Sequence, residues 1–394
     1  MNKLPSDWQI KTINEVCNIY TGNSINKKKK EENFIGLKEG LNYIGTKDIS
    51  FNNIIEYENG VKIPFKDLKD FKIAKSNTSL LCIEGGSAGR KIGFTNQDVC
   101  FGNKLCCFEA IEDEPKFIYF YLQSNDFLRE FNSNIQGLIG GVNKENLRKI
   151  KIPIPPLDEQ RRIASALSKI DAYLENTIKL IEEKERFKRG IAKKLLTCKE
   201  GENIPEARFK GFEDEWKETQ ILEFVNNNII KIEKGKSITK SKIEEGDIPV
   251  IAGGKTPPYY HNKYNYNFPC ITISASGSAG YVWFHDYKIW ASDCHVIYTD
   301  NKRYNIKFLY HYLKNIQDLI YYLQVGGVQK HVYAKDLIKL NIPNITIEEQ
   351  EKIGGYLSLL DEEIDNLKKQ KELIKEMKRG AMQKLLSGEV RLLE

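Results

Sequence analysis

The segment 152–160 reads Ile-Pro-Ile-Pro-Pro-Leu-Asp-Glu-Gln, and it begins a stretch that occurs twice in the chain. The second copy begins at 342–350 with Ile-Pro-Asn-Ile-Thr-Ile-Glu-Glu-Gln. The copies end on Lys-Arg-Gly-Ile-Ala-Lys-Lys-Leu-Leu at 188–196 and Lys-Arg-Gly-Ala-Met-Gln-Lys-Leu-Leu at 378–386, and they align without a gap. A repeat of this length is a duplicated structural unit, so we expect two similar halves.

Between these ends, the apolar residues of each copy recur at steps of three and four, which predicts a long helix packed lengthwise on a partner helix. Because one narrow stripe requires one facing helix, we expect the two copies to pair with each other. The alternative is two independent amphipathic helices, each packed on its own domain. The predicted helix-pair interface consists of Ile163, Leu167, Ile170, Leu174, Ile181, Ile191 and Leu195 with Ile353, Leu357, Leu360, Ile364, Leu367, Ile374 and Leu385.

Local signals place the ends of these helices. The prolines at 155–156 block helix before the first copy, and Thr346 with Glu349 predicts a capping box at the start of the second. Gly388 suits a left-handed cap after the second helix.

Gly190 and Gly380 occupy matched positions inside the helical pattern. Glycine there costs about 1 kcal/mol relative to alanine. Their positions therefore indicate close approach of another helix backbone, with a tolerated kink as the alternative.

The duplication extends beyond the helices. Matched landmarks are 4–25 with 212–238, 41–45 with 248–251, 86–89 with 277–280, 117–122 with 308–313 and 140–142 with 326–328. The clusters at 86–89 and 277–280 read Gly-Ser-Ala-Gly after short β-type runs and predict tight turns between strands. The segments 117–122 and 308–313 are apolar enough to be core helices.

These landmarks predict an α+β protein with two similar mixed α/β domains and two long helices. We place the first domain at 1–151, the first helix at 152–199, the second domain with its leading linker at 200–341, and the second helix with its tail at 342–394. The linker that carries Arg208 and Trp216 has its counterpart split between Arg391 and Trp8, so the two termini are expected to lie close together.

Composition limits the classes of protein to consider. The chain has 394 residues, 41% hydrophobic content and a net charge of +6, which permits an anionic partner. Residues 1–7 lack the apolar run of a signal peptide, and no stretch reaches membrane-spanning length, so we expect a cytoplasmic protein. The eight cysteines show no Cys-x-x-Cys spacing, so no zinc site or redox motif is expected.

The candidate catalytic motifs are incomplete. All five histidines (His261, His285, His295, His311 and His331) lie in the second half, so none can serve machinery that both halves share. The Gly-Lys-Ser at 235–237 resembles the end of a phosphate-binding loop, but Ile230 stands where that motif requires glycine. The segment 256–259, Thr-Pro-Pro-Tyr, resembles the Asp/Asn-Pro-Pro-Tyr motif of adenine methyltransferases. Its threonine is a poorer fit than aspartate or asparagine, whose side chain accepts a hydrogen bond from the exocyclic amine of the flipped base.

Taken together, two variable domains and two helices that begin near Glu-Gln and end in Lys-Leu-Leu resemble the DNA-specificity subunit of type I restriction-modification systems. The resemblance covers the whole chain. It implies two target-recognition domains held apart by an antiparallel coiled coil. Each domain would read one half of a bipartite double-stranded DNA target, and the helices would set the distance between the two half-sites. It also implies docking of two modification subunits that carry S-adenosylmethionine, and of motor-nuclease subunits that use ATP and Mg²⁺. No catalytic residue, metal site, cofactor or membrane contact is expected in this chain itself.

The candidate DNA contacts are lysines and the shared glycine turns. The two halves are expected to read different bases, so the turns that they share should touch the DNA backbone. Reading of bases needs side chains from the loops that differ between the halves, and the sequence does not show which of these side chains do so. For the four-lysine run, a solvated loop is the alternative. The candidates are Lys27, Lys28, Lys29, Lys30, Lys47, Gly86, Ser87, Gly89, Arg90, Lys91, Lys255, Asn262, Lys263, Gly277, Ser278, Gly280 and Tyr281. The possible base readers are Asn23, Lys47, Asn103, Lys255, Asn262 and Lys263.

Two functions from different classes follow. The first is a non-catalytic DNA-recognition subunit. The second is a stand-alone adenine-type DNA methyltransferase with its site at Thr256-Pro257-Pro258-Tyr259.

Overall fold

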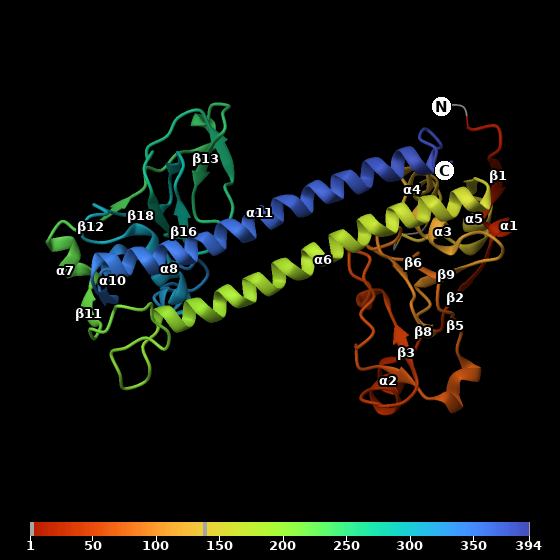
Figure 1. Ribbon diagram of the computed structural model, residues 1–394, viewed down its shortest axis with the longest axis horizontal. Helices are drawn as coiled ribbons and strands as arrows, with labels where there is room; N and C mark the ends of the chain where they lie inside the picture. Colours follow the sequence, from red (N-terminus) through yellow and green to blue (C-terminus); the bar gives the residue numbers. More distant parts are fainter. Residues whose placement is uncertain (1–3, 137–139, 394) are drawn as a thin grey trace. The chain divides into compact units, whose positions relative to one another are not determined.

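A computed structural model describes residues 4–136 and 140–393. The chain divides into two compact units, Met1–Thr177 with Gln370–Glu394, and Ile178–Lys369. Each unit therefore contains part of the long helix α6 (Leu157–Leu196) and part of the long helix α11 (Ile347–Leu386) (Figure 1).

The first unit contains short strands and helices ahead of α6. They are β1 (Gln9–Thr12), α1 (Ile13–Val16), β2 (Cys17–Thr21), α2 (Lys27–Asn33), β3 (Leu41–Ile44), η1 (Thr46–Asp48), β4 (Lys62–Ile63), η2 (Phe65–Asp70), β5 (Ile73–Ala74), β6 (Ser79–Cys82), β7 (Ile92–Phe94), β8 (Val99–Phe101), β9 (Leu105–Ala110), α3 (Pro115–Tyr121), α4 (Asn125–Ser133), α5 (Lys144–Lys149) and β10 (Lys151–Ile154).

The second unit repeats this order with fewer elements. They are β11 (Lys217–Gln220), α7 (Ile221–Asn226), β12 (Ile230–Lys234), η3 (Lys240–Lys242), β13 (Ile248–Ile251), β14 (Tyr259–His261), β15 (Cys270–Ser274), β16 (Val282–His285), β17 (Trp290–Ala291), β18 (Cys294–Thr299), α8 (Ile306–Asn315), α9 (Gln317–Tyr322), α10 (Ala334–Leu337) and β19 (Asn341–Asn344).

Sheet topology shows that the two units share one frame. The antiparallel sheet β2-β9-β6-β7 corresponds to β12-β18-β15-β16. The parallel pair β3 with β8 corresponds to β13 with β17, and the pair β1 with β10 corresponds to β11 with β19. The predicted duplication is therefore confirmed, and both Gly-Ser-Ala-Gly clusters connect antiparallel strands as expected.

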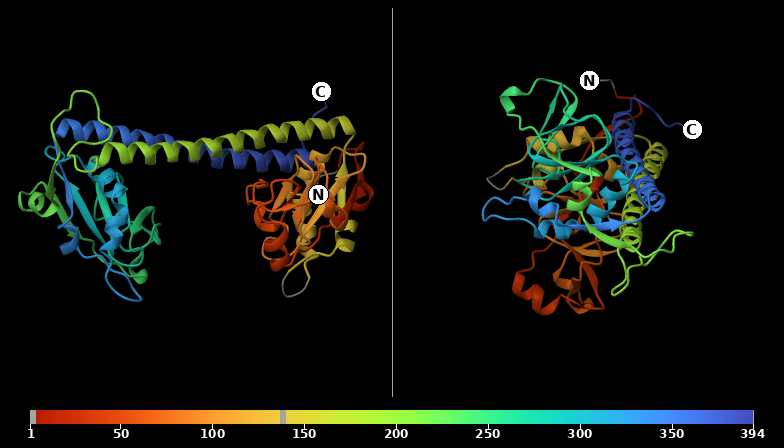
Figure 2. Two further views of the ribbon diagram at one scale, coloured as in Figure 1. Left: turned by 90° about the horizontal axis from the view of Figure 1, so that it is seen from below. Right: turned by 90° about the vertical axis from the view of Figure 1, so that its left-hand side faces the viewer.

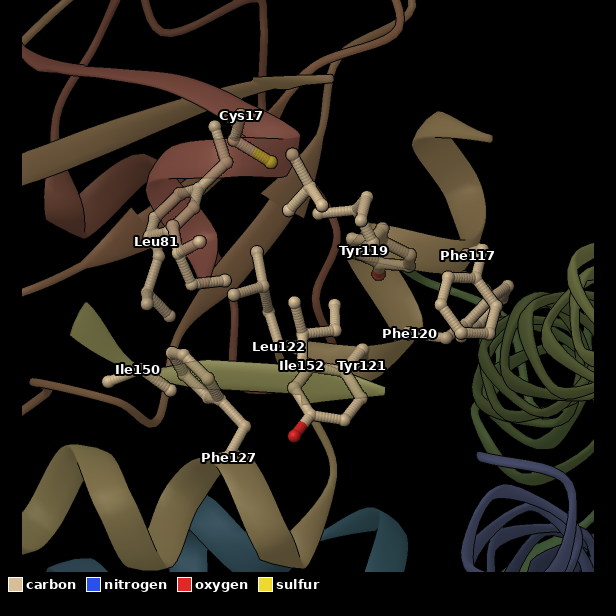
Figure 3. Packing of buried hydrophobic residues seen from close by; sticks show 14 of the residues in the cluster. Cys17, Leu81, Phe117, Tyr119, Phe120, Tyr121, Leu122, Phe127, Ile150 and Ile152 are labelled. Carbon is tan, nitrogen blue, oxygen red and sulfur yellow. The ribbon is translucent and has the colours of Figure 1, made fainter. Parts of the chain in front are cut away.

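The core of the first unit lies between the sheet β2-β9-β6-β7 and the helices α3 and α4 (Figure 3). Phe117 and Phe120 of α3 and Phe127 of α4 are at most 1% exposed. The Tyr121 hydroxyl, whose ring is also buried, donates a hydrogen bond to the Lys151 carbonyl at 3.0 Å. The predicted core helix at 117–122 is thus confirmed.

The core of the second unit repeats this arrangement around α8. Phe308 and Leu309 are fully buried, and the Trp216 ring meets Phe308 edge-on with a centroid separation of 6.3 Å. Tyr304 is fully buried as well, and its hydroxyl donates to the Pro343 carbonyl at 2.7 Å, which satisfies its only polar group.

Helices α6 and α11 each contain 40 residues, about 60 Å of helix. In the first unit Asp171 of α6 pairs with Lys378 of α11 at 2.6 Å, and in the second unit Lys188 of α6 pairs with Asp361 of α11. Because Asp171 matches Asp361 and Lys188 matches Lys378 in the repeat, the two contacts are the same pair with the helices exchanged. The helices therefore run antiparallel and pair as in an isologous interface, side by side in Figures 1 and 2.

Burial along the helices follows the predicted stripe. The fully buried members are Ile163, Leu167, Ile181, Leu195, Ile353, Leu357, Leu360, Ile364, Ile374 and Leu385, and the partly buried members are Ile170, Leu174, Ile191 and Leu367. Much of this apolar surface is completed by the domain cores, since Ile163 and Leu385 belong to the first core and Leu195 and Ile353 to the second. The seam is thus shared between helix pairing and domain packing.

The expectation of a close helix approach at Gly190 and Gly380 is wrong for this chain. A Cβ atom at either position would meet nothing within 4 Å. The close approach occurs instead at Gly354, where a Cβ atom would lie 2.6 Å from the Phe308 backbone nitrogen of α8. Sequence position alone does not reveal which side of a helix faces a neighbour.

The capping box predicted at the start of α11 forms only in half. The Thr346 hydroxyl accepts a hydrogen bond from the Glu349 N–H at 3.4 Å, but the Glu349 carboxylate does not return to Thr346. It accepts bonds from the Arg208 guanidinium at 2.7 and 2.9 Å and from the Trp216 indole at 3.3 Å. The predicted left-handed cap at Gly388 is confirmed by its φ of 74°.

The first unit holds the same carboxylate, guanidinium and indole from separate ends of the chain. Glu159 accepts two bonds from Arg391, both at 2.7 Å, and one from the Trp8 indole at 3.2 Å. Arg391 also pairs with Asp7, and this pairing lowers the pKa of that carboxyl. The segments 5–8 and 388–391 therefore lie side by side, and the expectation that the termini are close is confirmed for the described residues.

A circularly permuted chain should therefore fold. We predict that joining residue 394 to residue 1 with a short flexible linker, and opening the chain at Lys199, keeps both cores, because Arg391 and Trp8 then occupy one linker as Arg208 and Trp216 already do. Circular dichroism and thermal unfolding should match those of the natural chain. A permutant opened within β15 serves as the negative control, and equal loss of structure in both would contradict the prediction.

Neutralising Glu349 should destabilise the second unit. Glu349→Gln removes the charge that pairs with Arg208 and leaves a buried guanidinium short of acceptors, so the free energy of unfolding should fall by about 2–3 kcal/mol. Urea unfolding followed by tryptophan fluorescence measures it, since Trp216 shares the same carboxylate. The control Glu348→Gln, at an exposed neighbouring position, should change stability by less than about 0.5 kcal/mol. Equal effects of the two substitutions would be inconsistent with this role for Glu349.

Candidate nucleic-acid interface

In the first unit, the turn between β6 and β7 lies against the segment that follows β3. The Lys91 ammonium donates to the Thr46 carbonyl at 3.0 Å. Arg90 and Lys91 also lie 5.2 and 4.9 Å from the centre of the Phe51 ring, which is 60% exposed. The structure thus brings the Lys47-bearing segment and the glycine turn together into one positively charged surface.

The second unit builds the same junction from different residues. The Ser278 N–H donates to the Gly253 carbonyl at 2.6 Å, and a Cβ atom on Gly277 would lie 2.7 Å from that carbonyl, so only glycine fits. Lys255, just beyond Gly253, places its ammonium 5.6 Å from the centre of the Tyr281 ring. A lysine and a glycine turn therefore lie together in each unit.

A third segment joins this junction in the second unit. Val325 and His331 exchange two backbone hydrogen bonds of 2.8 Å, which close a hairpin, and His331 forms a β-bridge with Ser276 beside the glycine turn. The Val332 N–H then donates to the Ala275 carbonyl at 3.1 Å. The hairpin base is fixed to the turn between β15 and β16 that carries Gly277 and Ser278.

The first unit has the corresponding base. Gln136 and Gly141 exchange backbone bonds of 2.8 and 3.2 Å, and Gly141 bridges Glu84. Gly141 therefore corresponds to His331. The expected match of 140–142 with 326–328 is wrong by four residues, because Gly141 closes the first hairpin whereas Gly326 and Gly327 directly follow Val325 at the start of the second. Residues 137–139 lie outside the described residues.

The four-lysine run is helical. Asn26 caps α2 by accepting from the Lys29 N–H at 2.8 Å, so the run is a helix and not the solvated loop of the alternative, while its contact with DNA stays a prediction. Lys27 and Lys28 each lie 3.9 Å from a glutamate one turn later, and such exposed pairs contribute little. The first three lysines of the run are exposed to solvent, and the fourth, Lys30, is partly buried.

Asn262 and Lys263 are engaged within the chain. Both bind the Glu244 carboxylate, at 2.7 and 3.2 Å, and they lower its pKa. Asn23 accepts from the Lys72 N–H at 2.7 Å, and Asn103 is exposed between β8 and β9. Asn262 and Lys263 are exposed as Asn103 is, although Glu244 holds both of them.

The Gly-Lys-Ser segment is a packing element. Its backbone N–H groups are used within the chain: Gly235 donates to Cys294 and Lys236 donates to Ala291, both at 2.9 Å. A Cβ atom at Gly235 would lie 2.4 Å from the Ser292 carbonyl, and one at Gly22 would lie 1.9 Å from the Phe101 carbonyl. Both glycines permit the same close strand approach, so no phosphate-binding loop exists here.

The titratable residues of the second unit are structural. Burial lowers the pKa of His285 and of His311 to about 3, and burial raises the pKa of Cys270 and of Cys294 to about 12. Within residues 4–136 and 140–393, no cluster of histidine, cysteine, aspartate and glutamate could hold a metal ion. Over the same residues, no helix has the length and hydropathy needed to cross a bilayer.

The Thr-Pro-Pro-Tyr segment connects β13 and β14 at the surface. Tyr259 and Tyr260 are 39% and 54% exposed, and Tyr259 lies under the Lys240 ammonium at 5.9 Å. A methyltransferase motif instead needs an enclosed aromatic pocket for a flipped base. The segment is a proline turn.

Known proteins share this arrangement. The family described as Type I restriction modification DNA specificity domain matches residues 5–183 and 213–376. A putative type I restriction enzyme MjaX specificity subunit of Methanocaldococcus jannaschii is 31% identical over 64% of this chain and 62% of its own length. The type I restriction enzyme MjaVIII specificity subunit of the same organism is 24% identical over 99% of this chain and 94% of its own length. The crystal structure of a type I restriction-modification S subunit from M. genitalium has a TM-score of 0.68 at 19% identity, and it covers 98% of this chain and 97% of that one.

Proposed function

The chain belongs to the type I restriction modification DNA specificity family, and on that basis we propose that it recognises a bipartite double-stranded DNA target, one half-site per unit. The observation that carries the proposal is that the family matches twice, once in each half of one duplicated frame. A shared frame holding unlike loops suits two readers of different sequences. We propose 1–151 and 200–341 as the two target-recognition domains, with the helices setting the gap between half-sites.

In this proposal, the shared junctions bind the DNA backbone. Lys47, Arg90 and Lys91 in the first unit, and Lys255 beside Tyr281 in the second, would neutralise phosphates. Backbone N–H groups of the glycine turns add hydrogen bonds that carry no sequence information. The four lysines of α2, which have no counterpart in the second unit, would extend the phosphate contacts of the first half-site.

Catalysis belongs to other subunits. The names of the relatives and the exposed position of 256–259 both favour recognition over a stand-alone methyltransferase. We propose that modification subunits supply S-adenosylmethionine and methylate adenine, and that motor-nuclease subunits supply ATP hydrolysis with Mg²⁺. No such group is assigned to residues of this chain.

Two modification subunits suit the exposed face of the long helices. Phe187 of α6 and Met377 of α11 occupy matched positions and are 53% and 50% exposed, although both are large apolar side chains. Three residues beyond each lies Gly190 or Gly380, with open space around it. On one helix face, an exposed apolar residue beside a glycine allows a partner helix to pack closely. Since the feature occurs once on each helix, two copies of one partner fit.

Domain exchange tests the function. Replacing residues 1–151 by the equivalent part of a relative should change one half of the methylated sequence and leave the other unchanged. Methylation mapping of cells that express the chimera with its modification subunit measures both halves at once, and exchange of 200–341 is the reciprocal control. A change in both half-sites from a single exchange would contradict the division.

The docking sites can be tested one at a time. Phe187→Asp and Met377→Asp each place a charge at one proposed contact, so each variant should retain one modification subunit and the double variant none. Native mass spectrometry or light scattering of the assembled complex counts the subunits. The control Tyr322→Asp, at another exposed apolar residue outside the long helices, should leave the count unchanged. Full assembly of the double variant would count against these sites.

A further inference from the structure

The hairpin between Val325 and His331 has a closed base and a tight turn. Its base is closed by the two 2.8 Å backbone bonds and held by the bridge to Ser276. Gly326 has a φ of 113°, and a Cβ atom there would lie 2.4 Å from the Gln329 carbonyl, so the turn is tight and requires glycine. The hairpin projects from the rest of the second unit (Figure 2, left).

The tip exposes an unusual set of side chains. Val328 has a relative exposure of 107%, so its whole apolar side chain stands in solvent. Gln329 and Lys330, the next two residues, are exposed as well. A valine at the end of a fixed turn adds nothing to the core, whereas an apolar group beside an amide and a cation suits a nucleic-acid groove.

We propose that this hairpin enters the major groove of the half-site read by the second unit, and that its tip reads an A·T pair. This inference rests on the proposed function. The major groove, about 12 Å wide, admits a two-stranded ribbon. There, Gln329 can bond both N6 and N7 of adenine, and Val328 can contact the C5 methyl group of thymine.

The charges around the hairpin fit this orientation. Lys330 lies beside the tip and Lys255 lies at the junction to which the hairpin base is attached, so one ammonium is available to phosphates near the tip and one to phosphates near the hairpin base. Lys314 also lies over the Tyr281 ring, at 4.3 Å, but it is partly buried and donates to the Val282 carbonyl at 3.3 Å, so Lys255 is the cation offered to phosphate here. Phosphates on either side of the groove would therefore meet positive charge.

Modified bases separate the two contacts. The full complex with its modification subunits is first offered a pool of random duplexes, and the selected sequence gives the bipartite target. Each thymine of the second half-site is then replaced by deoxyuridine, which lacks only the methyl group, and each adenine by 7-deazaadenine, which lacks only the N7 acceptor. We expect one deoxyuridine to weaken binding several-fold and one 7-deazaadenine to weaken it by about tenfold or more.

Substitutions at the tip should remove these penalties selectively. In Val328→Ser the deoxyuridine penalty should disappear, and in Gln329→Ala the 7-deazaadenine penalty should disappear together with the preference for adenine at that position. Lys330→Ala is the matched control, which should weaken binding to all sequences equally. All three positions are exposed, so the thermal unfolding of each variant should match that of the natural chain. Binding to the first half-site, which the substitutions do not touch, is an internal control.

The outcomes distinguish the two levels of the proposal. If both half-sites are selected but Val328→Ser and Gln329→Ala keep the wild-type preference and both penalties, the hairpin does not read bases and the inference is overturned while the proposed function stands. If the natural complex selects no sequence at all, the proposed function fails, and this inference fails with it.

Discussion

Two buried carboxylates hold the long helices to the domains. Glu159 and Glu349 are 1% and 2% exposed, and burying a carboxylate costs several kcal/mol unless it is paired and hydrogen-bonded. Each receives two bonds from an arginine and one from a tryptophan indole, so the unfavourable desolvation is offset only when all three groups meet. The first turn of each helix is thereby fixed to the segment that leads into the domain.

The glutamine that follows each carboxylate extends this attachment into the core. The Gln160 side chain accepts from the Glu114 N–H at 2.9 Å, just before α3, and the Gln350 side chain accepts from the Asn305 N–H at 2.8 Å, just before α8. Each amide also donates to a carbonyl in the approach to its own helix. The repeated Glu-Gln pair thus connects helix, linker and core helix, which explains why it marks both copies of the repeat.

Features that depend on neighbouring residues in sequence could be predicted, and features that depend on distant partners could not. The heptad stripe, the glycine turns and the cap at Gly388 follow from local periodicity and backbone geometry, and all are present. The capping box failed because Arg208, far from Glu349 in sequence, binds that carboxylate more strongly than a backbone N–H does. The glycine landmarks at 326–328 were misaligned because the paired glycines close the first hairpin but begin the second, a difference that only the bridges reveal.

In the candidate site, too, local features could be predicted and contacts between distant residues could not. The glycine turns and nearby lysines could be found because they recur in both halves, yet nothing in the sequence indicated that Lys91 reaches Thr46 or that Asn262 and Lys263 bind Glu244. The segment 326–328 was noted only as a glycine landmark, and nothing in the sequence indicated that Val328, Gln329 and Lys330 lie exposed in a closed hairpin. Exposure of Val328 is a property of the folded chain alone.

Stability and assembly are coupled through the exposed face of the helices. A glycine inside a helix lowers its stability by about 1 kcal/mol relative to alanine, and neither Gly190 nor Gly380 gains a contact within the chain in return. Phe187 and Met377, one turn earlier, leave apolar surface in water at the same places. A partner that covers these positions binds the folded helices and not the unfolded chain, so by mass action it raises the apparent stability of the whole subunit. Under the proposed docking, the helix pair is therefore more stable in the assembled complex than in the isolated subunit.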